Sequence, residues 1–226
     1  MRSNHTVRLS APGRYASGFL VSKALVDASL SAHLDPGAGE LPSHLSDRAE
    51  FVLTAAHFLR GSGGSSPIRV RGVRLSGTAR EHVSIFGTDI GVLRLETPAP
   101  TRQLPMLSPT PIRFGQRTVT YGFGGRSNAL VPKELPGRVL ARVPFALSRN
   151  PFTRVRHGVM VFNHPEPAIR GDSGGPVLSD GLVYGLQSMI TDPLGFNTRV
   201  ATVAALVPHL PAIRRAMEQF GDANQE

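Results

Sequence analysis

One serine in this sequence stands among glycines, directly before an apolar run. The segment Arg170–Leu178 reads RGDSGGPVL, with Gly171 and Gly174 on either side of Asp172 and Ser173. Glycine is costly in regular structure and is tolerated where the backbone turns sharply or approaches a ligand closely. A tight hairpin corner would explain these glycines, and so would a nucleophile whose neighbouring amides must face a substrate. Other segments of the sequence distinguish between these two interpretations.

Two further segments place chemically useful side chains at the ends of apolar strands. FVLTAAHFL (Phe51–Leu59) has His57 just after a strand, and GTDIGVLRLETP (Gly87–Pro98) has Asp89 immediately before one. Alone, the histidine would be read as a half-buried residue and the aspartate as a turn former. Together, in the order His, Asp, Ser, they supply the base, the carboxylate that orients it and the nucleophile of acyl transfer.

Short strands must position these side chains. The 226 residues include 24 Gly and 19 Pro, which interrupt short apolar runs, so we expect a mainly β fold.

The segment Ser29–Asp47 is rich in small and polar residues and is predicted to be a surface loop, whereas Ala201–Phe220 has the apolar spacing of a C-terminal helix. The proline-rich stretch Glu96–Gln116 predicts a crossing linker, with a domain boundary near residue 105. The expected strands are Val7–Ser10, Tyr15–Ser22, Glu50–Leu53, Ile68–Leu75, Ile90–Leu95, Arg117–Gly122, Gly137–Pro144, Val155–Asn163, Gly175–Leu178, Leu182–Gln187 and Asn197–Ala201.

Composition restricts the setting and the partners. The chain has no cysteine, which excludes disulfides and thiolate metal sites. The N-terminal segment lacks the apolar core of a signal peptide, and no segment approaches the roughly 18 apolar residues that a membrane span requires, so we expect a cytoplasmic protein with no membrane partner. No cofactor and no metal are expected.

Positive charge is concentrated in the middle of the chain. Residues 51–160 carry 16 Lys and Arg against 4 Asp and Glu, within a net charge of +9. Such a stripe can attract nucleic acid, but the arginines alternate with apolar residues, as in IRVRGVRL (Ile68–Leu75), which is typical of strands with one solvated face. The chain has 3 Tyr and no Trp to stack on bases, which also argues against nucleic acid.

The three segments resemble the chymotrypsin and trypsin family of serine proteases. The similarity lies in LTAAH, TDIGVLRL and GDSGGPV, with weaker similarity in SGFLVS (Ser17–Ser22), VTYGFG (Val119–Gly124), GLQS and NTRV. The resemblance implies two six-stranded antiparallel β-barrels and a C-terminal helix. It places His57 and Asp89 on the first barrel, residues 1–105, and Ser173 on the second, residues 106–226.

The same resemblance implies the role of each site residue. Ser173 would be the nucleophile, His57 the general acid and base, and Asp89 the residue that orients the histidine. The amides of Gly171 and Ser173 would form the oxyanion hole. The substrate would be a protein or peptide, cleaved by a serine endopeptidase.

The sequence also departs from the family. Many relatives are activated by a cut that frees an amino terminus to pair with the aspartate before the nucleophile, here Asp172. Only 17 residues precede Gly18, which is too little chain for an activation arm of that kind. Because a buried unpaired carboxylate is costly, another cation should compensate Asp172, and Arg117 and Arg126 are the first candidates.

The resemblance also implies where the specificity pocket lies. Its base would be at Pro167, six positions before the nucleophile, and Arg170 is also expected to contact the substrate. Its wall would be Ser188, Met189 and Ile190, whose backbone would pair with the substrate as an added strand. An uncharged base and a branched Ile190 predict a preference for small or medium uncharged side chains. Alternatively, Glu166 or Asp192 turns into the pocket and selects a basic residue.

Other functions stay open at this stage. Gly171-x-Ser173-x-Gly175 also fits the nucleophile elbow of an α/β-hydrolase, but Gly174, Gly175 and Pro176 prevent the helix that must follow, and only His209 lies downstream. A catalytically silent interaction module with the same fold is the second alternative. For an active enzyme without a signal or an activation arm, we expect narrow specificity and a regulatory protein partner, as in bacterial antiviral defence or cell-death modules.

Overall fold

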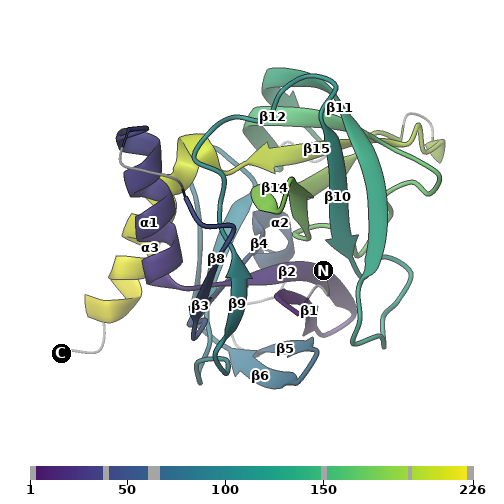
Figure 1. Ribbon diagram of the computed structural model, residues 1–226. Coiled ribbons are helices and arrows are strands. Elements are labelled where there is room, and N and C mark those ends of the chain that lie inside the picture. The colour runs from purple at the N-terminus through teal and green to yellow at the C-terminus, as the bar shows by residue number, and fades with distance from the viewer. Residues whose placement is uncertain (1–3, 38–40, 61–66, 149–151, 193–194, 223–226) are drawn as a thin grey trace.

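The computed structural model describes residues 4–37, 41–60, 67–148, 152–192 and 195–222 (Figure 1). Short strands dominate, as the spacing of glycine and proline predicts. In the first half the elements are β1 (Thr6–Ala11), β2 (Arg14–Val21), α1 (Lys23–Leu34), β3 (His44–Asp47), β4 (Phe51–Ala55), α2 (Ala56–Arg60), β5 (Ile68–Gly72), β6 (Leu75–Ala79), β7 (His82–Ser84), β8 (Ile90–Arg94) and β9 (Arg102–Pro105). In the second half they are β10 (Arg117–Gly122), β11 (Lys133–Leu147), β12 (Arg154–Asn163), β13 (Pro176–Ser179), β14 (Leu182–Ile190), β15 (Val200–Ala205), a 3-10 helix (Val207–His209) and α3 (Leu210–Asp222).

The first half forms a curled seven-stranded sheet. Its strand order is β6-β5-β1-β2-β4-β8-β7, and β3 pairs separately with β9. Along β5 the side chains alternate between buried and exposed, so Arg69 and Arg71 lie on a solvated face, as the IRVRGVRL pattern predicts. Every residue of the central strand β4 is buried. This strand leads directly into α2, the helix that carries His57.

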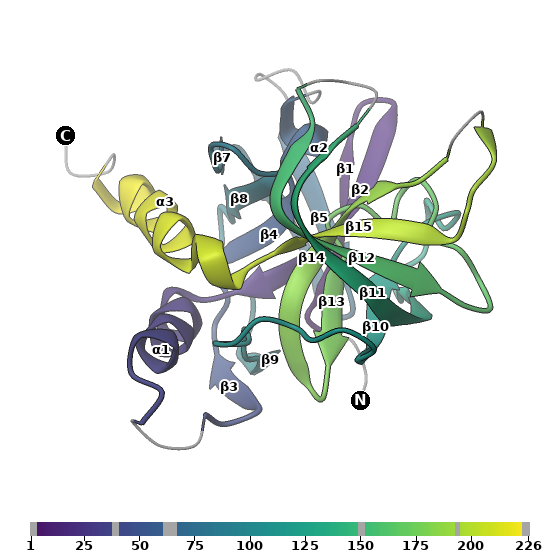
Figure 2. The same ribbon diagram turned by 90° about the horizontal axis from the view of Figure 1, so that it is seen from above.

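The second half forms a closed six-stranded barrel. Its strand order is β10-β11-β12-β15-β14-β13, and closure leaves no unpaired strand edge (Figure 2). The predicted class, mainly β with two antiparallel barrels and a C-terminal helix, is confirmed. The first half is a curled half-barrel and not a closed six-stranded barrel, because it has seven strands and its edge strands β6 and β7 do not pair with each other.

The prediction of a surface loop over Ser29–Asp47 is wrong at both ends of the segment. Helix α1 covers residues up to Leu34, and β3 covers the end of the segment; residues 38–40 lie outside the described part of the chain. Ser22 caps the helix by accepting a hydrogen bond from the Leu25 amide, and Leu25, Val26 and Leu30 are buried. Tertiary burial of this apolar face outweighs the polar composition of the segment.

The C-terminal helix is confirmed as α3, but it begins at Leu210, because the first part of the predicted range Ala201–Phe220 forms strand β15 and the 3-10 helix. Helix α3 lies against α1 (Figures 1 and 2). Arg214 forms ion pairs with Asp27 of α1 and Glu218 of its own helix, at 2.9 and 3.3 Å. Ile213, Met217 and Phe220 point into the core, and the Phe220 ring lies 6.0 Å from that of Phe51. The helix therefore returns the end of the chain to the first sheet.

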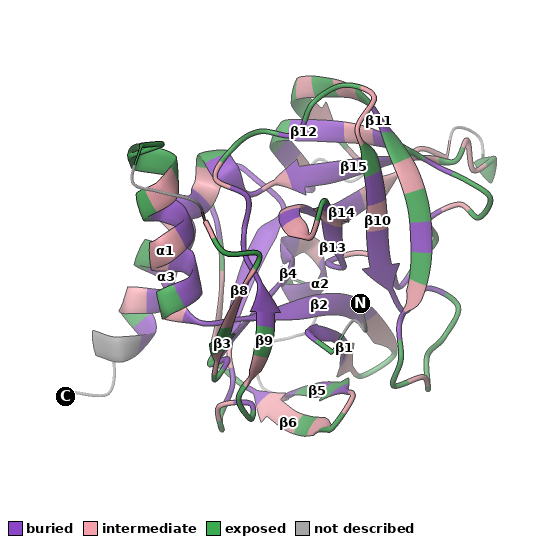
Figure 3. Cartoon of the chain, viewed as in Figure 1, coloured by how far each residue is buried: buried purple, intermediate pink, exposed green. Residues whose placement is uncertain are grey.

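One large hydrophobic core joins the two halves. It includes Leu9, Phe19 and Leu53 from the first sheet together with Val183 and Leu186 from the barrel. Figure 3 shows the buried residues along β2 of the sheet and β10 of the barrel. The strands of the first sheet end at residue 94 and those of the barrel begin at 117, but a division into two domains at residue 105 stays a prediction. No helix in the described ranges is long and apolar enough to cross a membrane.

Candidate active site

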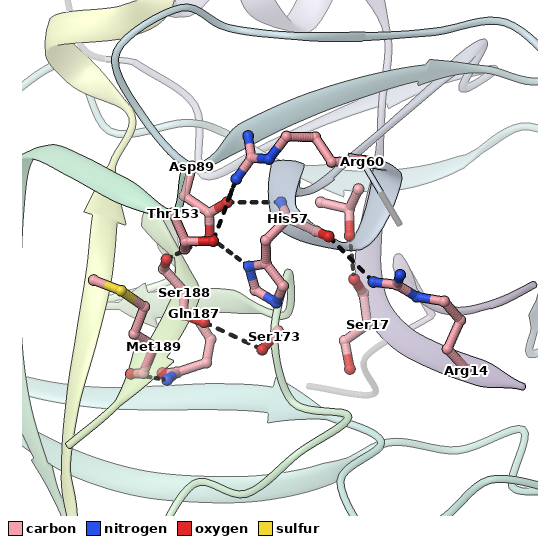
Figure 4. Close-up of polar contacts among 11 residues, drawn as sticks. Arg14, Ser17, His57, Arg60, Asp89, Thr153, Ser173, Gln187, Ser188 and Met189 are labelled. Atoms are coloured by element: carbon pink, nitrogen blue, oxygen red, sulfur yellow. Dashed lines mark hydrogen bonds and ion pairs between the residues drawn. The ribbon is translucent and has the colours of Figure 1, made fainter. Parts of the chain in front are cut away.

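His57 and Asp89 form a tight pair. His57 lies at the start of α2, directly after β4, and Asp89 precedes β8, the strand that pairs with β4. The His57 Nδ1 atom is 2.7 Å from Asp89 Oδ2, and the His57 amide donates to Asp89 Oδ1 at 2.8 Å (Figure 4). Because a carboxylate only accepts, His57 donates from Nδ1, and in the neutral imidazole this tautomer leaves Nε2 as an acceptor.

Asp89 is fully buried and is held from two further directions. Ser188 Oγ donates to Asp89 Oδ2 at 2.5 Å, and Arg60 approaches Asp89 Oδ1 at 3.5 Å. Arg60 also donates to Thr153 Oγ1 at 3.4 Å, on the loop that joins β11 and β12. The carboxylate thus connects the first sheet to the barrel. Nothing in the pattern of the sequence singled out Arg60.

Ser173 lies in a loop that β2 holds in place. Ser17 donates from its amide to the Ser173 carbonyl at 2.8 Å and from its hydroxyl to the Gly171 carbonyl at 2.7 Å. The Ser173 hydroxyl donates to the Ser188 carbonyl at 3.2 Å (Figure 4). The structure therefore brings Ser173, His57, Asp89 and Ser188 into one site. Ser188 is 2 % exposed and forms hydrogen bonds with both Asp89 and Ser173.

The glycines on either side of the Asp172–Ser173 pair are required by backbone angle and by space. Gly171 has φ +101°, and an added Cβ there would lie 2.5 Å from Tyr15 Cε2. Gly174 has φ +86°, and an added Cβ would overlap the Ser17 carbonyl oxygen and Thr54 Oγ1. These residues allow the loop to press against β2 and β4. A simple hairpin corner would not need such contacts.

We predict that Gly174→Ala lowers the free energy of unfolding by about 3 kcal/mol or more, because backbone strain and steric overlap add at this position. Gly181→Ala is the matched control: Gly181 has φ +83° but no atom within 4 Å of an added Cβ. It should cost only the strain, about 1 kcal/mol. Urea unfolding of both variants measures the difference, and equal losses would contradict the packing argument.

Asp172 is compensated by Lys133. The carboxylate is fully buried and accepts from the Gly124 amide at 2.7 Å and the Ile169 amide at 2.9 Å. The Lys133 ammonium lies 3.4 Å from Asp172 Oδ2 with a side chain only 10 % exposed. Burial raises the pKa of Asp172, while the two amides and Lys133 act in the opposite direction.

The expectation that Arg117 or Arg126 pairs with Asp172 is therefore wrong. Arg117 begins β10 at the end of the strand remote from Gly122, and Arg126 is exposed in the loop after that strand. Lys133 begins β11 opposite Gly122, where its side chain reaches the carboxylate. An added Cβ at Gly122 or Gly124 would overlap the Asp172 carboxylate, which accounts for the glycine pair in VTYGFG.

A cleft of about 940 Å³ contains His57 and Ser173. Of the predicted pocket residues, Arg170, Ser188, Met189 and Ile190 line it, as does Asp192. Pro167 is half-buried and is not among the lining residues, and Glu166 is 67 % exposed at 4.0 Å from Lys133. The residues that the sequence did not predict in this cleft are Arg14, Arg60, Leu147, Ser148, Phe152, Thr153, Ile169, Thr191 and Thr202.

Comparison with known proteins decides the family. The model of the trypsin-like peptidase domain matches residues 16–186, a range that holds His57, Asp89 and Ser173. The chain belongs to the trypsin-like peptidase family. No curated protein matches the chain in sequence.

Solved trypsin-like peptidases share the fold of this chain. Kallikrein-related peptidase 10 is 18 % identical with a TM-score of 0.66, covering 96 % of this chain and 97 % of that one. The active form of the Rv3671c protease from M. tuberculosis is 18 % identical with a TM-score of 0.64, covering 94 % and 82 %. The MamO protease domain from Magnetospirillum magneticum is 18 % identical with a TM-score of 0.62, covering 93 % and 96 %. At this identity the likeness concerns the fold alone.

Proposed function

We propose that this peptidase is a serine endopeptidase in which Ser173 is the nucleophile, His57 the general acid and base, and Asp89 the orienting carboxylate. The observation that carries the proposal is the 2.7 Å contact between His57 Nδ1 and Asp89 Oδ2 in the cleft that also holds Ser173. It leaves the His57 Nε2 lone pair free to accept a proton, which is what a serine hydroxyl needs to become a nucleophile.

The reaction would proceed through an acyl-enzyme. Ser173 Oγ turns from the Ser188 carbonyl toward His57 Nε2, gives up its proton to that nitrogen and bonds to the scissile carbonyl carbon. His57 then returns the proton to the leaving amine as the C–N bond breaks, and a water molecule repeats the sequence to release the acid. Asp89 stabilises the imidazolium that forms in each half of the reaction.

The oxyanion would be held by the Gly171 and Ser173 amides. Asp172 lies between these two residues, and its carboxylate accepts from the Gly124 and Ile169 amides. The loop is thus fixed before substrate arrives, and preorganised donors cost no rearrangement in the transition state. Removing one such donor in related chemistry costs about 100- to 1,000-fold in kcat.

The cleft supports a preference for small or medium uncharged side chains before the cut. Met189 and Ile190 continue the strand from Ser188, and neither leaves the open slot that a glycine would. The alternative is a basic preference set by Asp192, which lines the same cleft. One misplaced methylene in such a pocket is worth about 1 to 3 kcal/mol of discrimination.

We expect a proteome-derived peptide library to be cut after small or medium uncharged residues. New amino termini, identified by mass spectrometry, should appear with the wild type and be absent with Ser173→Ala. Dominant cleavage after Arg or Lys would contradict the uncharged pocket, and its loss in Asp192→Ala would identify the carboxylate responsible. Absence of any cleavage by the folded wild type would refute the proposed function.

The biological setting is part of the same proposal. We expect narrow specificity, control by a partner protein, and a role in a bacterial defence or cell-death module. The supporting argument is that an unrestricted peptidase would damage the cell that makes it. Efficient degradation of casein by the isolated chain would count against narrow specificity.

A further inference from the structure

Among the residues that the structure describes, three arginines line the active-site cleft. They are Arg14 at the start of β2, Arg60 at the end of α2 and Arg170 next to Gly171, and Asp192 is the one carboxylate among these described lining residues. Arg60 already faces Asp89 at 3.5 Å. Within the described ranges, no carboxylate lies within ion-pair distance of Arg14 or Arg170.

Arg14 is fixed in place by its surroundings. Its guanidinium donates to the His57 carbonyl at 3.1 Å and lies over the Phe58 ring, 5.1 Å from the centroid. Burial lowers the pKa of Arg14, because the cation is partly removed from water. A partly desolvated, preorganised guanidinium is a ready donor for an anionic group.

Arg170 and Arg14 belong to segments that lie side by side. Arg170 immediately precedes Gly171, and Gly171 packs against Tyr15, the residue after Arg14. Ser17 ties the same two segments together through its bond to the Gly171 carbonyl. The two segments therefore meet at one rim of the cleft, which both arginines line.

This rim lies on the leaving-group side of the scissile bond. A substrate that pairs with Ser188–Ile190 as an added strand places its acyl portion beside Met189. Figure 4 shows Met189 and Arg14 on opposite sides of His57 and Ser173. Residues that follow the cut are thus directed toward β2 and the Arg170 loop.

We propose that the peptidase selects substrates with carboxylate side chains in the first positions after the scissile bond, and that Arg14 and Arg170 bind them. The inference rests on the proposed function, because it names the substrate class of the same site. A charge-assisted contact to a held arginine should improve kcat/KM by about 10-fold for each arginine engaged. The preference should weaken as salt screens the exposed part of the contact.

The test compares matched peptides that differ only after the cut, with Asp or Asn at the first two positions. The wild type should cleave the Asp peptide faster, and the double variant Arg14→Gln, Arg170→Gln should lose most of that ratio. The double variant Arg113→Gln, Arg142→Gln is the charge-matched control: both arginines are exposed and outside the cleft, so the ratio should stay unchanged. A ratio near one in the wild type, or a ratio that survives in the cleft variant, would overturn the inference.

A second variant guards against misfolding of the first. Arg170→Glu alters only an exposed side chain and leaves Arg14 in place, so it should lower the ratio of Asp to Asn cleavage by about 10-fold or more, because a repulsive carboxylate replaces one favourable contact. An unchanged ratio would also overturn the inference. Cleavage of both peptides without discrimination counts against the inference alone, whereas no cleavage of either peptide by folded wild type refutes the proposed function and the inference with it.

Discussion

Ser173→Ala should lower kcat/KM by about 10⁶-fold while leaving the fold intact. Related triads lose about this factor when the nucleophile is removed, because the covalent step and the proton transfer are lost together. The residue is half-buried in the cleft, and among the described residues its hydroxyl makes one hydrogen bond, to the Ser188 carbonyl. The free energy of unfolding should therefore change little. Steady-state hydrolysis of a cleaved peptide measures the effect.

His57→Ala should cause a similar loss of activity. The informative comparison is between each single variant and the double variant Ser173→Ala, His57→Ala. If Ser173 and His57 act as one unit, each single substitution removes nearly all of the catalysis that the pair supplies, and the double variant is no slower than either. Losses that multiply in the double variant would contradict this coupling. So would substantial activity in Ser173→Ala.

Lys133→Met should reduce kcat/KM by about 100-fold and lower the free energy of unfolding by about 3 to 5 kcal/mol at neutral pH. It leaves the Asp172 carboxylate buried without its cation, and an uncompensated buried charge destabilises the folded state strongly. Asp172 stands between Gly171 and Ser173, so a carboxylate that moves toward water takes the oxyanion amides with it. The expected activity loss is that of one oxyanion donor.

The pH dependence of stability separates this mechanism from simple loss of packing. Burial raises the pKa of Asp172 above its ordinary value of 3.8, so the carboxylate costs stability as pH rises through that window. Without Lys133 the pKa rises further and the cost at neutral pH grows. The difference between Lys133→Met and wild type should thus be largest near neutrality and shrink as Asp172 is protonated in acid.

The chain offers a matched control for this substitution, because Lys23 and Lys133 are its only lysines. Lys23 lies on α1 with a 40 % exposed side chain paired to Asp27 at 2.8 Å. Lys23→Met should change activity by less than twofold and stability by less than about 1 kcal/mol. Lys133→Arg keeps the charge and should recover part of the activity. Equal effects of Lys23→Met and Lys133→Met would contradict the role given to the buried pair.

The candidate triad could be predicted because each of its residues sits in a short local pattern. LTAAH ends a buried strand in a short helix, TDIG puts Asp89 directly before the first residue of the paired strand, and GDSGG needs backbone that only glycine provides. Such local requirements are visible in sequence. The long strands β11 and β12 and the C-terminal helix were likewise found in outline, since apolar periodicity fixes their faces.

What the sequence did not predict depends on contacts between distant residues. The partner of Asp172 is 39 positions away at Lys133, and strand register, which is invisible in composition, sets it opposite Gly122. Arg14 and Arg60 reach the cleft by the same kind of long-range packing. Helix α1 was not predicted, because its apolar face is narrow and most of its residues are small or polar. Its stability depends on packing against α3 and the first sheet, which the sequence pattern does not reveal.

A fluorophosphonate probe tests the central claim most directly, because it bonds to a serine only when a neighbouring base and an oxyanion hole activate the hydroxyl. The wild type should gain one probe, located on Ser173 by peptide mass spectrometry. Ser173→Ala should gain none, and His57→Ala should react far more slowly. A probe on any other residue, or no reaction with the folded wild type under any buffer condition, would contradict the assignment of Ser173 as an activated nucleophile.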